Sequence, residues 1–306
     1  MTAINQPAVF DADRQVAGDL GGTVTTGADV TATADTNQHY DLDPDIFGQF
    51  LDPLRKYSSA LYTSDTETLE QAQRNKLRFV ADRLGLRGGE RLLDVGCGWG
   101  SLILFMAEEF GCDTLGVSPA PRQHEYIAEQ AVARGVAERV HTQVGHFERL
   151  ELAPRSFDAV TLLGSIVHMP DLGEVFRRAR SVLRRGGTLY VSESCFRNAA
   201  SHNAFDNKAG TEFVREDIFG WGDLRPLSDL VTAAEDAGFA IIAVDDLTEH
   251  YRRTIDDWIA NVYASAERID AHGPGLAAKL RHYLEIANAG WGYTTKHYAL
   301  TCRNAR

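Results

Sequence analysis

The sequence predicts a doubly wound α/β protein with a mostly parallel, seven-stranded sheet. Short apolar runs alternate with amphipathic stretches from residue 91 onward, which is typical of parallel strands covered by helices on both faces. A glycine-rich turn joins the first apolar run to the helix that follows it. The alternation pauses before the last strand, where two helical stretches predict an inserted lid over a ligand crevice.

Each strand is expected where a short apolar run is bounded by turn or polar residues. The expected strands cover residues 91–96, 113–118, 139–145, 157–165, 188–194, 239–247 and 294–302. Amphipathic stretches between them predict helices at 101–110, 122–134, 172–183 and 227–237, and the two lid helices are expected at 251–269 and 276–289. We expect Gly186 and Gly187 to end the helix at 172–183, because glycine pairs favour turns.

The residues before the first strand divide into an arm and two helices. Residues 1–36 are expected to form a flexible arm, because the stretch 21–37 carries no large apolar side chain that would offset its ordering entropy. The arm is interpreted either as a plain disordered tail or as a functional segment, namely a swapped arm or a cover for the active site. Apolar residues at helical spacing then predict helices within 43–53 and 67–86.

One domain is expected to follow the arm, over residues 37–306. Its lid segments are expected at about 197–225 and 248–290, the two places where helical stretches interrupt the alternation. The first lid segment contains four large aromatic side chains, Phe205, Phe213, Phe219 and Trp221. These rings either line an apolar pocket or cap the core.

Composition narrows the class of protein. The chain has 306 residues, with 43 acidic and 31 basic side chains and a net charge of −12. This acidic balance argues against nucleic-acid binding and against docking on anionic membranes. No apolar run approaches the roughly 18 residues of a membrane span, and no signal peptide is recognised, so a cytoplasmic protein without stable membrane insertion is expected. Four cysteines at no metal-ligand spacing predict neither a disulfide framework nor a metal site; homo-oligomerisation is left open.

The glycine-rich turn is the sharpest chemical signal. The segment LLDVGCGWGS runs from a strand into Asp94, then through Gly96, Gly98 and Gly100, and then into a helix. Glycine permits a tight strand-to-helix turn and a close approach of ligand to backbone. The unpaired N–H groups of the helix N-terminus favour a carboxylate or a phosphate. The alternative interpretation is a turn of purely structural origin.

The spacing of the turn separates two kinds of cofactor. A dinucleotide site requires G-x-G-x-x-G and an acid at the end of the second strand. Here the pattern is G-x-G-x-G, and the second strand ends in Val117 and Ser118, which argues against NAD. The carboxylate of Asp94 suits a ligand with an ammonium group. A ligand with both an ammonium and a carboxylate is an amino acid, and S-adenosylmethionine is one that also carries a nucleoside.

Five motifs together resemble one known family. They are HYDLDPDIFGQFLDP (39–53), YSSALY (57–62), LDVGCGWG (93–100), HYRRTIDDW (250–258) and TTKHYALTC (294–302). The glycine motif is common to many methyltransferases, whereas the combination is more specific. Residues 39–302 resemble the S-adenosylmethionine-dependent cyclopropane fatty acid synthase and mycolic acid methyltransferase family.

The resemblance implies a Rossmann-like class I methyltransferase fold with S-adenosylmethionine as the cofactor. The residues expected to bind the cofactor are Tyr57, Ser58, Asp94, Gly96, Gly98, Gly100, Ser118, Gln123, His146 and Phe147. Among these, Ser118 and Gln123 are implied at the ribose, and His146 and Phe147 near the adenine. Core packing is the alternative for Phe147. Trp99 and Tyr57 are candidates to place an aromatic face near the sulfonium.

Three positions depart from the family pattern. The cyclopropane-forming members hold a bicarbonate ion that takes a proton from the substrate carbocation. The resemblance places Val167 at the position of the glutamate ligand of this ion, and Ser59 and Ala287 at the positions of its two cysteine ligands. Of the family's ligands, only the tyrosine is present, as Tyr251. The cofactor half of the site therefore matches, whereas the proton-removing half is largely missing. This favours plain methyl transfer to another acceptor, and no cyclopropane lipid is expected.

The segment GSIVHMPD (164–171) follows the fourth strand, where substrate should meet the cofactor. His168 in this segment is the candidate general base, because imidazole accepts a proton near neutral pH. The alternative is a histidine that only orients the loop. Tyr251 is a weaker catalytic candidate, and His250 is weaker still. Glu193, just past the fifth strand, is a candidate to face the pocket, although solvation is expected because lone acids at strand ends are usually solvated.

Three classes of function stay open. The leading one is a methyltransferase that acts on carbon, oxygen or nitrogen of a small-molecule acceptor, either a natural product or a lipid-like compound. The second is lipid modification of the cyclopropane type. The third is a non-catalytic cofactor-binding protein of the same fold, and an NAD-dependent oxidoreductase is a distant fourth.

Overall fold

The computed structural model describes residues 44–206, 208 and 222–305. The predicted arm lies outside the described residues, as do Phe213, Phe219 and Trp221 of the first lid segment. Within the described part, seven strands form one sheet in the order β3-β2-β1-β4-β5-β7-β6. Strand β7 is antiparallel to both of its neighbours, and the other neighbouring strands are parallel. The predicted doubly wound, mostly parallel sheet is therefore confirmed.

The elements lie close to their expected residues. The strands are β1 (Arg91–Val95), β2 (Asp113–Ser118), β3 (Val140–Val144), β4 (Phe157–Leu163), β5 (Leu183–Phe196), β6 (Phe239–Asp246) and β7 (Thr295–Asn304). The helices that pack on the sheet are α3 (Leu69–Leu84), α4 (Ser101–Phe110), α5 (Pro121–Ala133), α6 (Leu172–Val182) and α9 (Leu227–Asp236). The remaining helices are α2 (Pro44–Phe50), η1 (Ile166–His168), α7 (Ala199–Phe205), α10 (Thr248–Ala264), α11 (Ala266–Asp270) and α12 (Leu276–Ala289).

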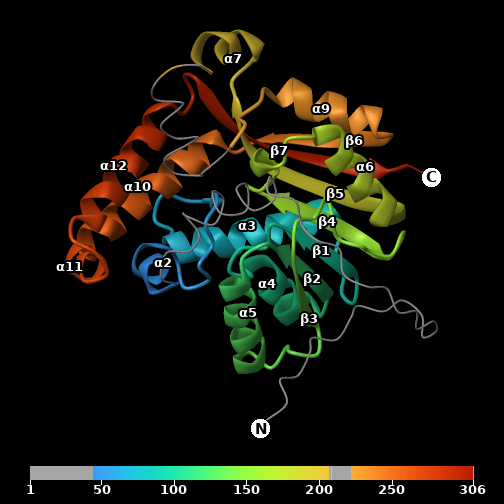
Figure 1. Ribbon diagram of the computed structural model, residues 1–306, viewed down its shortest axis with the longest axis horizontal. Helices are drawn as coiled ribbons and strands as arrows, with labels where there is room; N and C mark the ends of the chain where they lie inside the picture. The colour runs from blue at the N-terminus through green and yellow to red at the C-terminus, as the bar shows by residue number, and fades with distance from the viewer. Residues whose placement is uncertain (1–43, 207, 209–221, 306) are drawn as a thin grey trace, which may run out of the picture.

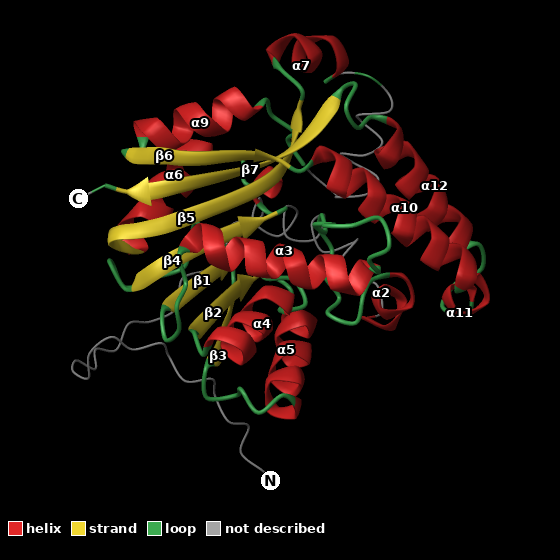
Figure 2. Cartoon of the chain, turned by 180° about the vertical axis from the view of Figure 1, so that it is seen from behind, coloured by secondary structure: helices red, strands yellow, loops and turns green. Residues whose placement is uncertain are grey.

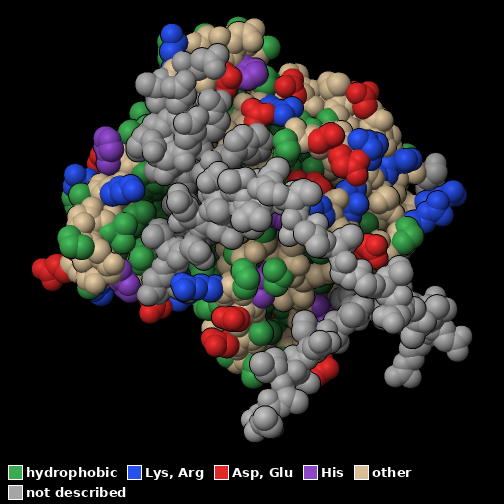
Figure 3. Space-filling model, viewed as in Figure 1, with side chains coloured by type: hydrophobic (Ala, Val, Ile, Leu, Met, Phe, Trp, Pro, Cys, Tyr) green, Lys and Arg blue, Asp and Glu red, His purple; other side chains and the backbone are tan. Residues whose placement is uncertain are grey.

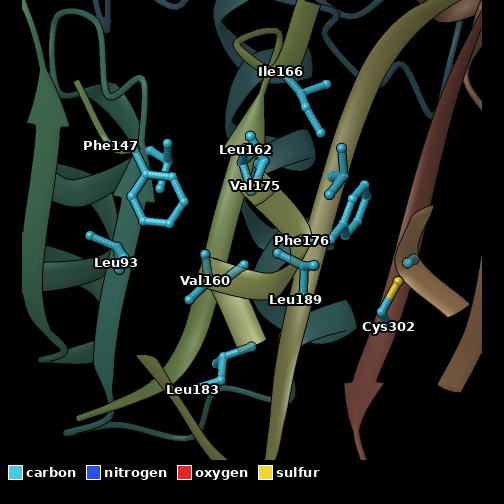
Figure 4. Packing of buried hydrophobic residues seen from close by; sticks show 14 of the residues in the cluster. Leu93, Phe147, Val160, Leu162, Ile166, Val175, Phe176, Leu183, Leu189 and Cys302 are labelled. Atoms are coloured by element: carbon cyan, nitrogen blue, oxygen red, sulfur yellow. The ribbon is translucent and has the colours of Figure 1, made fainter. Parts of the chain in front are cut away.

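Helices cover both faces of the sheet. Figure 2 shows α3, α4 and α5 on one face, with α6 and α9 on the other. On the second face, Val175 and Phe176 of α6 pack against Val160, Leu162 and Leu189 of the central strands (Figure 4). Each of these five side chains is at most 1% exposed. This close packing makes the sheet a firm support for the loops at its carboxyl edge.

The lid region contains α10, α11 and α12, which lie together with α2 at one end of the molecule (Figure 1). The side chain of Asn261 donates to the carbonyl of Phe50 at 2.9 Å, and Ser265 donates to that of Gln49 at 3.0 Å. Trp258 lies in the apolar cluster that these helices share. The second lid segment is thus tied to the N-terminal helix. The single helix expected at 251–269 is divided between α10 and α11 at Ser265.

The prediction for the glycine pair is wrong. Gly186 and Gly187 do not end a helix, since α6 ends at Val182 and β5 begins at Leu183. The pairing of β5 with β4 shifts register between Phe157 and Ala159. A Cβ on Gly187 would lie 2.9 Å from the carbonyl of Asp158, which is too close for any side chain. Gly187 therefore allows β4 and β5 to approach closely where their pairing is irregular.

The charged surface is mixed in sign. Figure 3 shows Lys and Arg side chains interspersed with Asp and Glu over the region of α6 and α9. This pattern differs from the single-signed stripe that a nucleic-acid backbone selects. Among the described residues, every helix is too short or too polar to cross a membrane.

Candidate active site

A pocket opens at the carboxyl ends of β1, β2 and β4, where the direction of strand order reverses. Its lining comes from short segments within 55–57, 95–101, 117–123, 145–148 and 163–169. Ligands of doubly wound sheets bind at this switch point. The predicted site residues that line the pocket are Tyr57, Gly96, Gly98, Ser118, Gln123, His146, Phe147 and His168. Those outside the lining are Ser58, Asp94, Gly100 and Tyr251.

The glycine turn needs left-handed backbone at three positions. The φ angles of Gly96, Gly98 and Gly100 are 77°, 52° and 76°. A Cβ on Gly96 would lie 2.3 Å from the Cβ of Ser165, and one on Gly100 would lie 2.5 Å from Ile127. These two glycines are required by packing as well as by φ. A Cβ on Gly98 would meet nothing within 4 Å, so this position faces open space along the pocket.

Asp94 lies beneath the turn and is 1% exposed. Its Oδ1 accepts a hydrogen bond of 2.7 Å from the hydroxyl of Thr161, whereas none of the described residues donates to Oδ2. Burial raises the pKa of Asp94, and the nearby charges of Lys56 and Lys76 oppose that rise. The vacant oxygen fits an ammonium partner, so the predicted role of Asp94 stands as a prediction.

The residues predicted to bind the ribose and the adenine line the pocket where β2 and β3 end. The hydroxyl of Ser118 donates to Oε1 of Gln123 at 2.6 Å, which fixes both polar groups at the pocket. His146 and Phe147 follow β3 and also line the pocket. Phe147 belongs to the apolar core, and the guanidinium of Arg178 lies 5.5 Å from its ring centre. Core packing and pocket lining are therefore compatible for this residue.

The N-terminal segment contributes Tyr57, whose ring centre lies 5.1 Å from that of Trp258 in α10. Ser58 is buried outside the lining, where its hydroxyl accepts a hydrogen bond of 3.0 Å from Lys76 Nζ. Trp99 lines the pocket and packs edge-on against Tyr126. The segment that precedes the sheet thus closes one side of the pocket.

The two catalytic candidates are placed differently. His168 ends η1, and its side chain belongs to the pocket lining. Its backbone N–H donates to the carbonyl of Ser165. Tyr251 lies in α10, and its ring contacts Trp291 and His297 at centroid distances of 4.8 and 4.7 Å. His250 accepts a hydrogen bond from the backbone of Tyr62. Of the three, only His168 stands in the pocket lining.

The expectation for Glu193 is wrong, because this side chain is buried and only 6% exposed. Its carboxylate accepts hydrogen bonds from the backbone N–H of Val167 at 3.2 Å and of Ser194 at 2.8 Å. Burial raises the pKa of Glu193 to about 7. A titratable carboxyl therefore supports the residue that directly precedes His168. The sequence signal for a role of Glu193 in the site was its position near the carboxyl end of a strand.

The pKa of Glu193 gives a prediction for stability. Because its pKa is higher in the folded state than the usual 4.5, the folded protein must hold a buried charge above pH 7. Stability should therefore fall by about 2–3 kcal/mol between pH 5 and pH 8 through this group alone. Urea unfolding of wild type and Glu193→Gln at both pH values is the test. A pH-dependent loss as large in Glu193→Gln as in wild type would contradict it.

The three departures from the family pattern are also placed. Val167 offers its backbone N–H to Glu193, and its side chain is buried. Ser59 is buried with its hydroxyl bonded to the carbonyl of Ala60. Ala287 packs against the apolar cluster of the lid helices. The positions thus offer one hydroxyl and two apolar side chains.

The sheet order, the antiparallel last strand and the glycine turn that lines the pocket define the class I methyltransferase fold. The sequence profile of the family described as mycolic acid cyclopropane synthetase matches residues 28–298. The chain belongs to this family, as its motifs predicted.

Known proteins of this family and fold resemble the chain. Sphingolipid C9-methyltransferase 1 of Gibberella zeae is 32% identical over 238 residues, 76% of this chain and 46% of that protein. A probable fatty acid methyltransferase of Pseudomonas putida is 29% identical over 226 residues, 73% of this chain and 57% of the relative. The chain thus spans about half the length of these relatives.

Solved structures give the fold. The mycolic acid cyclopropane synthase CmaA1, complexed with SAH and CTAB, superposes with a TM-score of 0.81 at 24% identity, covering 89% of this chain and 98% of that one. The [4+2]-cyclase SpnF superposes with a TM-score of 0.73 at 22% identity, over 94% of this chain and 99% of that one.

Proposed function

We propose that the protein is an S-adenosylmethionine-dependent methyltransferase that acts on a lipid-like or other small-molecule acceptor. The observation that carries the proposal is the pocket above the G-x-G-x-G turn at the switch point of the sheet, with eight predicted site residues in its lining. Membership of the family supports it. The names of the relatives, which include sphingolipid and fatty acid methyltransferases, support a lipid-like acceptor.

The residues of the pocket fit the cofactor. The open side of Gly98 allows backbone approach, and the vacant Oδ2 of Asp94 suits an ammonium group. Ser118 and Gln123 offer fixed polar groups for a ribose, and Phe147 offers an apolar wall for an adenine. When bound, S-adenosylmethionine supplies a methyl group on a cationic sulfur. The role of the pocket is then to align the acceptor with that methyl group and to exclude water.

His168 is proposed to accept the acceptor's proton, since it lies in the same pocket lining as the glycine turn. Glu193 holds the preceding residue through its bond to the N–H of Val167. Tyr251 lies in α10 and is the second candidate for contact with the acceptor. A base at this place is sufficient for an oxygen, nitrogen or activated carbon acceptor.

Cyclopropane formation is not part of the proposal. The side chain of Val167 offers no hydrogen bond to an anion, and the hydroxyl of Ser59 is already bonded to the backbone. Burying an anion such as bicarbonate without partners would cost several kcal/mol. The absence of those ligands therefore supports simple methyl transfer.

The test is turnover with a panel of acceptors. Purified protein is incubated with S-adenosylmethionine and, separately, with a ceramide, an unsaturated phospholipid, a phenol and a secondary amine, and release of S-adenosylhomocysteine is measured. Release above the acceptor-free rate, with a methylated product found by mass spectrometry, is expected for one class. Cyclopropane fatty acids in cells that express the protein would contradict the acceptor claim, and no release with any class would contradict methyl transfer itself.

Two substitutions test the cofactor site directly. Asp94→Ala removes the expected ammonium partner, and Gly98→Val directs a side chain into the space that the ligand needs. Each is expected to weaken binding of S-adenosylhomocysteine at least about tenfold, the effect of losing one charge-assisted bond. Calorimetry measures the affinity, with melting temperature and Asp94→Asn as checks on folding. Wild-type affinity in both variants would reject the assignment.

A further inference from the structure

Four charged side chains are buried together beneath the glycine turn, and we call them the buried charge cluster: Asp52, Lys56, Lys76 and Asp94. Each is at most 5% exposed. Burial lowers the pKa of Lys56 and of Lys76, and the nearby charges of Asp52 and Asp94 oppose this shift in both lysines. No pair among them comes within the 4.0 Å of a salt bridge. The Oδ2 of Asp94 is buried without a hydrogen-bond partner among the described residues, and an unpartnered buried charge is costly, so a ligand group at this place would stabilise the cluster.

The two lysines of the buried charge cluster differ in their surroundings. Lys76 Nζ donates to the hydroxyl of Ser58 at 3.0 Å, below the pocket. Lys56 lines the pocket itself, beside the glycine turn. Its backbone is held from both sides, since its N–H donates to Asp52 at 2.9 Å and its carbonyl accepts from Gln73 at 3.4 Å. Lys56 is thus a fixed, buried cation at the ligand's position.

The other cation of the pocket lining, Arg55, is partly engaged, and its Nη1 is buried without a hydrogen-bond partner among the described residues. The guanidinium of Arg55 lies 4.4 Å from the ring centre of Tyr126 and 5.9 Å from that of Trp99. It also approaches Asp45 at 3.8 Å. Lys56 differs from Arg55 in having no anionic group within 4.0 Å among the described residues, and its charge interacts with that of Asp94.

Lys56 lines the pocket, and Asp94 lies beneath the glycine turn with a vacant Oδ2, so one ammonium and one carboxylate oxygen flank the turn. An α-amino acid presents the opposite pair. We propose that Lys56 binds the carboxylate of the amino-acid part of S-adenosylmethionine, while Asp94 takes its ammonium. The assignment rests on the proposed function, and it gives the carboxylate a side-chain partner in addition to the N-terminus of α4.

The experiment is calorimetry with two ligands that differ only in the carboxylate, S-adenosylhomocysteine and its decarboxylated analogue. Lys56→Met is expected to weaken binding of S-adenosylhomocysteine about 10- to 100-fold, the range of a charge-assisted hydrogen bond. The affinity for the decarboxylated analogue should stay within twofold of wild type. Lys56→Arg should keep part of the wild-type preference in affinity for S-adenosylhomocysteine over its decarboxylated analogue. Lys279→Met, which removes an exposed lysine of α12, is the matched control.

Each other outcome overturns the assignment. Unchanged affinity of Lys56→Met for S-adenosylhomocysteine would leave the carboxylate to the N-terminus of α4. Equal losses for both ligands would show that Lys56 acts on the pocket as a whole. A carboxylate could also come from the acceptor, so laurate binding to the complex with S-adenosylhomocysteine is measured in parallel, and a loss confined to laurate would move Lys56 to the acceptor side. Failure of the wild-type protein to bind S-adenosylhomocysteine would instead remove the proposed function.

Discussion

Replacement of His168 by alanine is expected to lower the turnover number of methyl transfer roughly 10²- to 10⁴-fold, the range for loss of a general base. The imidazole stands in the lining of the pocket, on η1 at the carboxyl end of β4. Affinity for S-adenosylhomocysteine should stay near the wild-type value, because the residues assigned to the cofactor lie on other segments. A loss in turnover without a loss in binding is the signature of a catalytic group.

Single-turnover methyl transfer over a range of pH separates this role from a structural one. His168→Ala should be slow over the whole range, because the variant has no imidazole to accept the proton of the acceptor. His141 lies near the amino end of the edge strand β3, away from the carboxyl edge that carries the pocket, and it provides the control. His141→Ala should keep the wild-type rate. A wild-type rate in His168→Ala would make the histidine structural and leave alignment as the main source of catalysis.

Acidification is expected to destabilise the protein through His297. This side chain is buried in β7, with Nε2 bonded to the hydroxyl of Ser192 at 2.8 Å and the ring against that of Tyr251. Burial, with the charge of Lys76, lowers the pKa of His297 to about 3, although Asp246 opposes the shift. Below pH 6.5, His297 is therefore protonated in the unfolded chain but stays neutral in the folded protein. The free energy of unfolding falls as the pH drops from about 6.5 toward 3.

The size of the effect follows from the shift. Between pH 7 and pH 5 the loss through His297 amounts to about 2 kcal/mol, and it would approach 4–5 kcal/mol at pH 3. His297→Gln keeps a polar group beside Ser192 but cannot titrate. The free energy of unfolding in urea is measured for both proteins at pH 7 and pH 5, and the variant should lose about 2 kcal/mol less than wild type. Equal losses would show that His297 does not control the acid response.

Periodicity and turn chemistry were sufficient to predict the sheet and the position of its pocket. The sequence signals the left-handed φ angles of the three glycines locally, whereas the contacts that exclude a Cβ on Gly96 and Gly100 come from Ser165 and Ile127, farther along the chain. The error at Gly186 and Gly187 has a non-local cause. The same dipeptide that favours a turn also permits close contact between strands, and only the partner strand decides between the two.

The polar residues of the site were harder to predict. Glu193 and Lys56 are charged, and charged side chains are usually exposed. Glu193 accepts a hydrogen bond from the backbone of Val167 across 26 residues of sequence, and the charge of Asp94 in β1 acts on Lys56 in the N-terminal segment. A single sequence contains no periodic signal for such neighbours, because they meet only after the sheet and the lid have formed.

The bonds between α2 and α10 set the order in which the pocket is completed. Asn261 bonds to Phe50 and Ser265 to Gln49 across separations of 211 and 216 residues, and Thr254 holds the backbone of Ala60 across 194. Contacts this distant along the chain close large loops and slow folding. During synthesis, the wall that carries Tyr57 and Lys56 leaves the ribosome early but gains its packing partners only after α10 has emerged. A chain that ends before α10 would therefore lack the packing partners of the wall that carries Tyr57 and Lys56.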